Sequence, residues 1–139
     1  MNVTGTQNTI TNSGTLNNGV TVSGMTVLTN NGSYFGATTV NAGALIVIGS
    51  IANSPVTVNS GAALLGSGTV GSTVVNSGGF LVPGNSPGTM TVAGNLALQS
   101  GAFYIVQVNP ASTTNVSGTA SLAGTVGAIF ASGSYVTRF

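Results

Sequence analysis

Hydrophobic and polar residues alternate with a period of two in short segments along the chain. Clear examples occupy residues 20–22, 56–58, 90–92, 96–98 and 126–128. In a β-strand, successive side chains point to opposite faces, so this alternation predicts short strands with one buried face. Glycine occurs every few residues and costs about 1 kcal/mol relative to alanine inside a helix, which argues against a helical fold.

One phrase, built on Asn-Ser-Gly or Asn-Ala-Gly, recurs at a nearly constant spacing. Its three clear copies occupy residues 40–45, 58–64 and 75–81, and weaker copies occupy residues 11–16 and 98–103. The clear copies place their glycines at nearly equal intervals, at Gly43, Gly61 and Gly78. A period of roughly 17 to 23 residues is too short for helical repeats and suits one coil of a β-solenoid.

The pattern therefore predicts an all-β fold, a parallel β-solenoid of about six coils in a single domain at residues 1–139. Residues 37–108 contain the best-matching repeats, and residues 109–139 continue them as C-terminal coils. Residues 1–36 form either full coils or a looser arm. Turns rich in Asn, Gly, Ser and Pro separate the strands, as expected for tight corners.

Stacked coils place like residues above one another, about 4.7 to 4.9 Å apart. Columns of like charges would repel at this spacing, whereas Thr, Ser and Asn columns can form hydrogen bonds along the axis. We expect Asn41, Asn59 and Asn76, one in each clear copy, to form such a ladder. Six coils would give a rod roughly 30 Å long.

The composition agrees with uncharged stacked columns. Among 139 residues there are 22 Gly, 20 Thr, 16 Ser and 15 Asn, and a single charged side chain, Arg138. Disorder is not favoured, because 42% of the residues are hydrophobic and the mean hydropathy is +0.49. The longest apolar run, residues 44–48, is far below the ~18 residues of a membrane helix, so no membrane span is expected.

Missing residue types exclude most chemistry. The sequence has no Asp, Glu, His, Lys or Cys. General acid–base catalysis, activated Ser or Thr nucleophiles and hydrolytic metal sites all need such groups, so we expect no enzyme, no metal and no cofactor. Nucleic-acid binding needs clustered Lys and Arg and is not expected either. Cysteine is absent, so the sequence gives no information on the redox compartment.

A family resemblance emerges from residues 61–71 followed by residues 76–79 and 82–92. These segments, with the hexapeptide PGNSPG at their centre, resemble the repeat-bearing passenger region of bacterial autotransporters, the type V secreted proteins. The resemblance is strong over about half of the chain and looser over residues 94–130. It implies a right-handed parallel β-helix that is located at the bacterial surface or outside the cell. Relatives usually carry some charged residues, and this chain shows neither a signal peptide nor the membrane β-barrel domain of a full-length autotransporter.

The PGNSPG segment is interpreted as a corner of the solenoid. An alternative is an anion-binding nest of backbone amides, which Gly84 and Gly88 would favour. The corner is the simpler explanation, because glycine and proline are the usual residues of tight turns. Its residues, predicted to be structural like the repeat asparagines and glycines, are Pro83, Gly84, Asn85, Pro87 and Gly88.

Aromatic residues are the candidates for self-association: Tyr34, Phe35, Tyr104, Phe130, Tyr135 and Phe139. Neighbouring residues on a strand point to opposite faces. In each of the pairs Tyr34–Phe35 and Phe103–Tyr104, one ring is therefore expected in the core and the other at the surface. A sugar-stacking platform is the weaker alternative, and the sequence gives no support for surface glycans or host cells as partners.

Two functions remain. The first is a non-enzymatic structural protein of the bacterial surface or extracellular matrix, which self-associates into filaments because uncharged solenoid ends offer unpaired strand edges. The second is a stalk or adhesin section of a monomeric autotransporter passenger, whose binding parts lie outside this chain. We also expect stability to change little between about pH 4 and pH 9, because no side chain has an unperturbed pKa in that interval.

Overall fold

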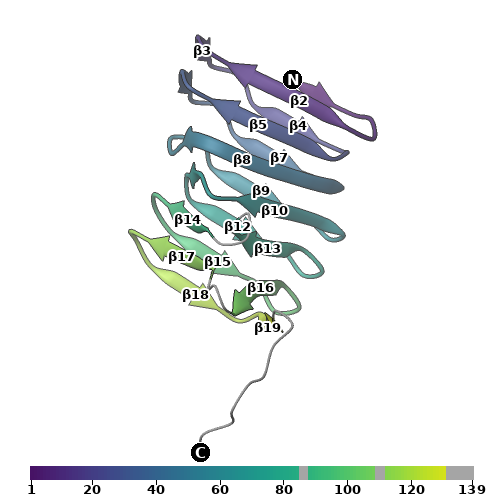
Figure 1. Cartoon of the computed structure of the whole chain (residues 1–139), viewed down its shortest axis with the longest axis vertical. Coiled ribbons are helices and arrows are strands. Elements are labelled where there is room, and N and C mark those ends of the chain that lie inside the picture. Colours follow the sequence, from purple (N-terminus) through teal and green to yellow (C-terminus); the bar gives the residue numbers. More distant parts are fainter. Residues whose placement is uncertain (85–87, 109–111, 131–139) are drawn as a thin grey trace, which may run out of the picture.

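The strands of the protein stack in parallel into a β-solenoid of about six turns, as the repeat predicts. The structure is a computed structural model, and it describes residues 1–84, 88–108 and 112–130. These residues form strands, turns and bends, with no helix among them. Figure 1 shows the coils stacked along the long axis of the molecule, from the N-terminal coil in purple to the last described coil in yellow.

One side of the solenoid is a sheet that we call the seven-stranded face. It contains one strand from each coil: β1 (Asn2–Val3), β4 (Val20–Val22), β7 (Thr38–Val40), β9 (Val56–Val58), β12 (Thr73–Val75), β15 (Leu96–Leu98) and β18 (Ala120–Leu122). Each pairs in parallel with the next. The three-residue strands β4, β7 and β9 have a buried–half-buried–buried pattern, which places a single side chain per strand on the outer surface.

The longer strands form a second side, which we call the broad face. It consists of β2 (Asn8–Asn12), β5 (Thr26–Asn30), β8 (Gly43–Ile51), β10 (Ala62–Gly66), β13 (Phe80–Pro83), β16 (Phe103–Val108) and β19 (Thr125–Phe130). These strands are also parallel and follow one another coil by coil. The broad face and the seven-stranded face enclose most of the core.

A third side closes the cross-section. Its strands are β3 (Thr15–Leu16), β6 (Ser33–Tyr34), β11 (Thr69–Val70), β14 (Thr89–Val92) and β17 (Thr113–Val116). Strand β8 turns the corner between two sides, because residues 45–49 pair with β5 on the broad face and residues 50–51 pair with β11 on the third side. Gly49 lies at this corner with a φ of 85°, a left-handed conformation that favours glycine.

The first 36 residues form coils of the same kind. β1 pairs with β4, β2 with β5, and β3 with β6. Coil length increases toward the C-terminus, since the chain advances 17 residues from Asn59 to Asn76 but 24 from Thr89 to Thr113, its partner in the next coil. The last coil is thus slightly longer than the repeat predicts.

Aliphatic side chains from the three sides fill the interior. Fully buried residues include Val22 and Val40 from the seven-stranded face, Leu45 and Leu64 from the broad face, and Met90 from the third side. Their outward neighbours along each strand are only half-buried, so the alternation in the sequence corresponds to inside and outside. Burial of these side chains is the main stabilising contribution, at about 25 cal/mol per Å² of apolar surface.

Candidate functional site

The three asparagines of the clear repeats form a hydrogen-bonded ladder at the end of the seven-stranded face. The side-chain amide of Asn59 donates to Asn41 Oδ1 at 2.8 Å, and that of Asn76 donates to Asn59 Oδ1 at 2.7 Å. Each amide thus satisfies its neighbour one coil away, which is the arrangement that the repeat spacing predicts. A column of this kind can be extended by a further amide at either end.

A second, buried amide pair was missed by the sequence analysis. The Asn12 amide donates to Asn30 Oδ1 at 2.7 Å, and Asn30 is only 4% exposed. Asn30 in turn donates to the backbone oxygens of Gly32, at 3.0 Å, and Ser50. Asn12 and Asn30 are separated by the same interval as Asn41 and Asn59, so aligning the weak first repeat at the coil period would have found them.

Tyr34 belongs to a buried chain of hydroxyl groups and is 2% exposed. Its hydroxyl lies 2.8 Å from Thr38 Oγ1, which lies 2.8 Å from Ser54 Oγ. Burial raises the pKa of the Tyr34 hydroxyl above its ordinary value of 10.0, while hydrogen bonds with Thr38 and Ser54 act in the opposite direction. The prediction that Tyr34 takes part in self-association is therefore wrong, because its ring is held inside the core.

The repeat glycines form a column of left-handed residues at one corner. Gly43, Gly61, Gly78 and Gly101 have φ values of 72°, 77°, 77° and 84°. The Gly61 amide donates to the Gly78 oxygen at 2.8 Å, and the Gly78 amide donates to the Gly101 oxygen at 2.7 Å. Their role is structural, because the corner needs a backbone conformation that residues with a Cβ rarely adopt.

The PGNSPG segment is described only at its two ends. Pro83 is buried at the end of β13, and Gly84, with a φ of 85°, forms an antiparallel bridge with Gly66. The Gly84 amide donates to the Gly66 oxygen at 2.8 Å, so it is not free to bind an anion. The Gly88 oxygen accepts from the Thr113 amide at 3.1 Å. Asn85 and Pro87 lie outside the described residues.

The remaining aromatic candidates occupy different environments. Phe35 follows the buried Tyr34 and is 52% exposed. Phe103 points outward from β16 and stacks on Phe80 with ring centroids 5.0 Å apart, whereas Tyr104 points inward. Each adjacent pair thus places one ring inside and one outside. Phe130 ends β19 but its side chain is not described, and Tyr135 and Phe139 lie outside the described residues.

One inward column of the seven-stranded face runs through every coil, and we call it the inner column. It consists of Val3, Val22, Val40, Val58, Val75, Leu98 and Leu122, each in register with the next. Leu98 is 3% exposed, but Leu122, in β18, is 64% exposed. At the other end, Val3 is half-buried and packs against the core. The inner column therefore ends in apolar residues that the described part of the chain leaves partly uncovered.

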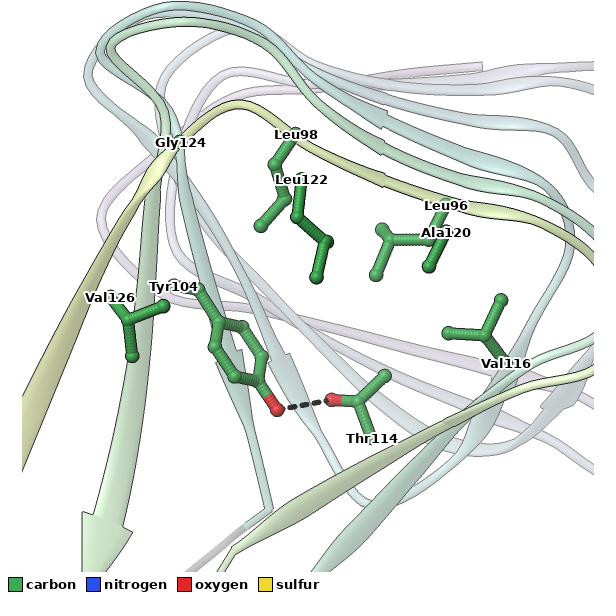
Figure 2. Close-up of a pocket in the computed structure, with 9 residues that line it drawn as sticks. All are labelled: Leu96, Leu98, Tyr104, Thr114, Val116, Ala120, Leu122, Gly124 and Val126. Carbon is green, nitrogen blue, oxygen red and sulfur yellow. Dashed lines mark hydrogen bonds between the residues drawn. The ribbon is translucent and has the colours of Figure 1, made fainter.

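The last described coil surrounds an open apolar cavity of about 240 Å³. Figure 2 shows its wall: leucines of β15 and β18, Val116 and Thr114 of β17, and Tyr104 and Val126 from the broad face. The Tyr104 hydroxyl donates to Thr114 Oγ1 at 3.0 Å. Val126 is 63% exposed, so the cavity opens at the end of the described solenoid. On the seven-stranded face, Leu96 and Leu98 one coil earlier are each 3% exposed, so the core is covered in that coil and open in the last described one.

Among the described residues, no cluster of His, Cys, Asp or Glu side chains could hold a metal ion. In residues 1–84, 88–108 and 112–130 there is no helix of the length and hydrophobicity needed to cross a membrane. Comparison with known proteins found no family model, no curated protein and no solved structure that matches the chain.

Proposed function

We propose that the chain is a non-enzymatic structural protein of the bacterial surface or extracellular matrix, which assembles head to tail into filaments. The observation that carries the proposal is the inner column, which ends in exposed Leu122 on one side and half-buried Val3 on the other. In a head-to-tail contact, Leu122 of one copy would take the place below Val3 of the next. The column would then continue as an unbroken row of aliphatic side chains.

Backbone pairing supports the same contact. Within the described residues, β18 pairs only with β15 and β19 only with β16, so each has one edge with no described partner. β1 and β2 present the complementary edges in the first coil. Unpaired strand edges are templates for further pairing, and natural proteins usually block them with charge or a cap. The part of the chain that the structure describes carries no charged side chain at either end.

A head-to-tail contact of this kind does not close on itself, so it produces a filament rather than a ring. The location outside the cell rests on the resemblance of residues 61–92 to autotransporter passengers. The alternative is a section of a longer monomeric passenger, in which further coils of the same chain cover the open end. Both functions assign the same physical role to Leu122, but they differ in whether the isolated chain polymerises.

Electron microscopy of the isolated chain at neutral pH tests the proposal. We expect filaments of uniform width with a repeat near 4.8 Å along the axis, roughly the spacing of stacked strands. Leu122→Lys should abolish them and leave folded single particles, because the ammonium would be buried at the contact without a partner. Thr57→Lys, on the outer surface in the middle of the solenoid, is the control and should form filaments. Discrete wild-type particles about 30 Å long would contradict the proposal and support the monomeric passenger.

A further inference from the structure

The outer surface of the broad face is largely apolar in the middle and last coils. Its first outward column contains Ala44, Ala63, Phe80 and Phe103, paired in that order. A second outward column contains Val27, Ile46, Leu65 and Val82, paired in that order. Leu65 and Val82 also line a shallow groove of about 180 Å³, together with Ile105 and Ile129 from the following coils. Of the large hydrophobic side chains that are strongly exposed, Met25, Ile48 and Ile129 lie on or beside this face.

Hydroxyl and amide groups are more frequent on the outer surface of the third side and in the first coils of the seven-stranded face. On the seven-stranded face, the outward column contains Asn2, Thr21, Thr39 and Thr57 in the first four coils, and it continues with Val74, Ala97 and Ser121. On the third side the outward column contains Ser50, Thr69, Thr91 and Asn115. The third side is therefore the polar side of the solenoid, and the broad face carries its large outward aromatic and aliphatic side chains. A contiguous exposed apolar surface of this kind is typical of an interaction site.

We infer that the broad face is a lateral dimer interface, in which two copies of this chain pack face to face with their axes antiparallel. The relevant symmetry is a two-fold axis that lies between the two faces and parallel to the strands. It reverses the order of the coils but keeps each column opposite the same column of the partner. Such an isologous contact requires a surface that is complementary to itself.

The first outward column has this complementarity. If the axis passes between the coils of Ala63 and Phe80, each of these residues faces the other across the contact, and Phe103 and Ala44 face each other in the same way. The two large rings, stacked 5.0 Å apart, thus meet the two smallest side chains of the column. Large residues opposite small ones permit packing near interior density.

The second outward column fits the same axis. Leu65 and Val82 lie in the two coils on either side of it, so each would face the other in the partner copy. Both are aliphatic and half-buried in the single chain, and both line the shallow groove. One placement of the axis therefore gives apolar contacts in both columns.

The area of the face fits a pair of copies. A strand rises about 3.3 Å per residue, and neighbouring strands lie about 4.8 Å apart. Six strands of about five residues therefore cover roughly 17 Å by 29 Å, or about 500 Å² per copy. A pair would bury about 1,000 Å², which is the lower limit for a specific interface. No described residue of the face is charged, so nothing on it selects a charged partner. This pairing does not depend on head-to-tail assembly, because it uses a side of the solenoid and not its ends.

Charge substitution at the centre of the face tests the inference. Leu65→Glu and Val82→Lys each place an unpaired charge in the interface, so each should raise the dimer dissociation constant at least about tenfold in sedimentation experiments. Mixing the two variants should restore pairs, because Glu at position 65 then faces Lys at position 82 of the partner. Thr57→Glu and Thr57→Lys, on the polar part of the seven-stranded face, are the matched controls and should pair like the wild type.

Circular dichroism establishes that each variant keeps its strand content. If Leu65→Glu does not fold, Ala63→Glu, at the position that would face Phe80, takes its place. Equal pairing by the wild type and both single variants would overturn the inference, as would an equal loss in the Thr57 controls.

Filaments one solenoid wide would overturn lateral pairing and leave the proposed function intact. Pairs that do not lengthen would support lateral pairing and contradict the proposed function, and single particles would contradict both.

Discussion

Asn59 donates a side-chain hydrogen bond of 2.8 Å to Asn41, which lies one coil earlier on the same corner of the solenoid. The contact is repeated by Asn76, which donates to Asn59 from the following coil. Asn59 is thus the central member of the ladder, with one bond on each side. Its neighbours at the two ends make one ladder bond each.

Replacing the central asparagine should cost more than replacing a terminal one. Asn59→Ala removes two ladder bonds and should lower the free energy of unfolding by about 1 to 2 kcal/mol, whereas Asn41→Ala should cost about half as much. Urea unfolding measures both values. Thr57→Ala is the control, because Thr57 lies in β9, the strand directly before Asn59, but takes no part in the ladder. Equal stability of Asn59→Ala and Thr57→Ala would show that the ladder contributes nothing.

The buried Tyr34 hydroxyl should make the protein sensitive to alkali. Its pKa is raised in the folded state, so the unfolded chain loses this proton at a lower pH than the folded protein does. The free energy of unfolding is therefore constant below about pH 10.0 and decreases as the pH rises from 10.0 through the folded pKa. Thermal unfolding between about pH 4 and pH 9 should show little change. In Tyr34→Phe the decrease above pH 10.0 should be smaller, since this side chain no longer titrates. An identical alkaline decrease in both proteins would show that Tyr34 is not its source.

Two adjacent leucines should respond very differently to truncation. Leu64 points inward and is 0% exposed, whereas Leu65 points outward and is half-buried. Leu64→Ala should cost about 2 to 5 kcal/mol through lost burial and the cavity that remains, and Leu65→Ala should cost less than half as much. Chemical unfolding of the two variants under conditions where the wild type is unpaired makes the comparison. Similar costs would mean that the inside–outside assignment of β10 is incorrect.

The column of left-handed glycines gives a further matched pair. A Cβ at Gly61 would meet nothing within 4 Å, so Gly61→Ala should cost only the strain of a positive φ, about 1 to 2 kcal/mol. A Cβ at Gly78 would also collide with Ser60 Oγ. Gly78→Ala should therefore be the less stable variant in thermal unfolding. Ser60→Ala should recover part of the difference, and no recovery would exclude the collision as its cause.

The sequence predicted the solenoid, its approximate coil length and the Asn41–Asn59–Asn76 column, because stacking at a nearly constant period puts equivalent residues in register. It did not predict the corner in β8, where one strand changes side at Gly49, since a bend leaves no trace in an alternating pattern. The Asn12–Asn30 pair was missed because it ends two strands of the broad face and so lies at a different corner from the clear repeats. Tyr34 was misassigned because its burial depends on hydroxyl partners elsewhere in the coils. The apolar broad face was not predicted either, because it depends on which outward residues the register aligns in successive coils.

The regular register of the first coils has a consequence for how such a protein can change its length. Thr21, Thr39 and Thr57 occupy equivalent positions in successive coils and are evenly spaced along the chain. Inserting or deleting one such repeat unit would move everything that follows by one strand spacing, about 4.8 Å, and leave the cross-section and both ends unaltered. In-frame duplication of a short stretch of DNA could therefore adjust the height of the rod in equal steps, without the need to redesign any contact.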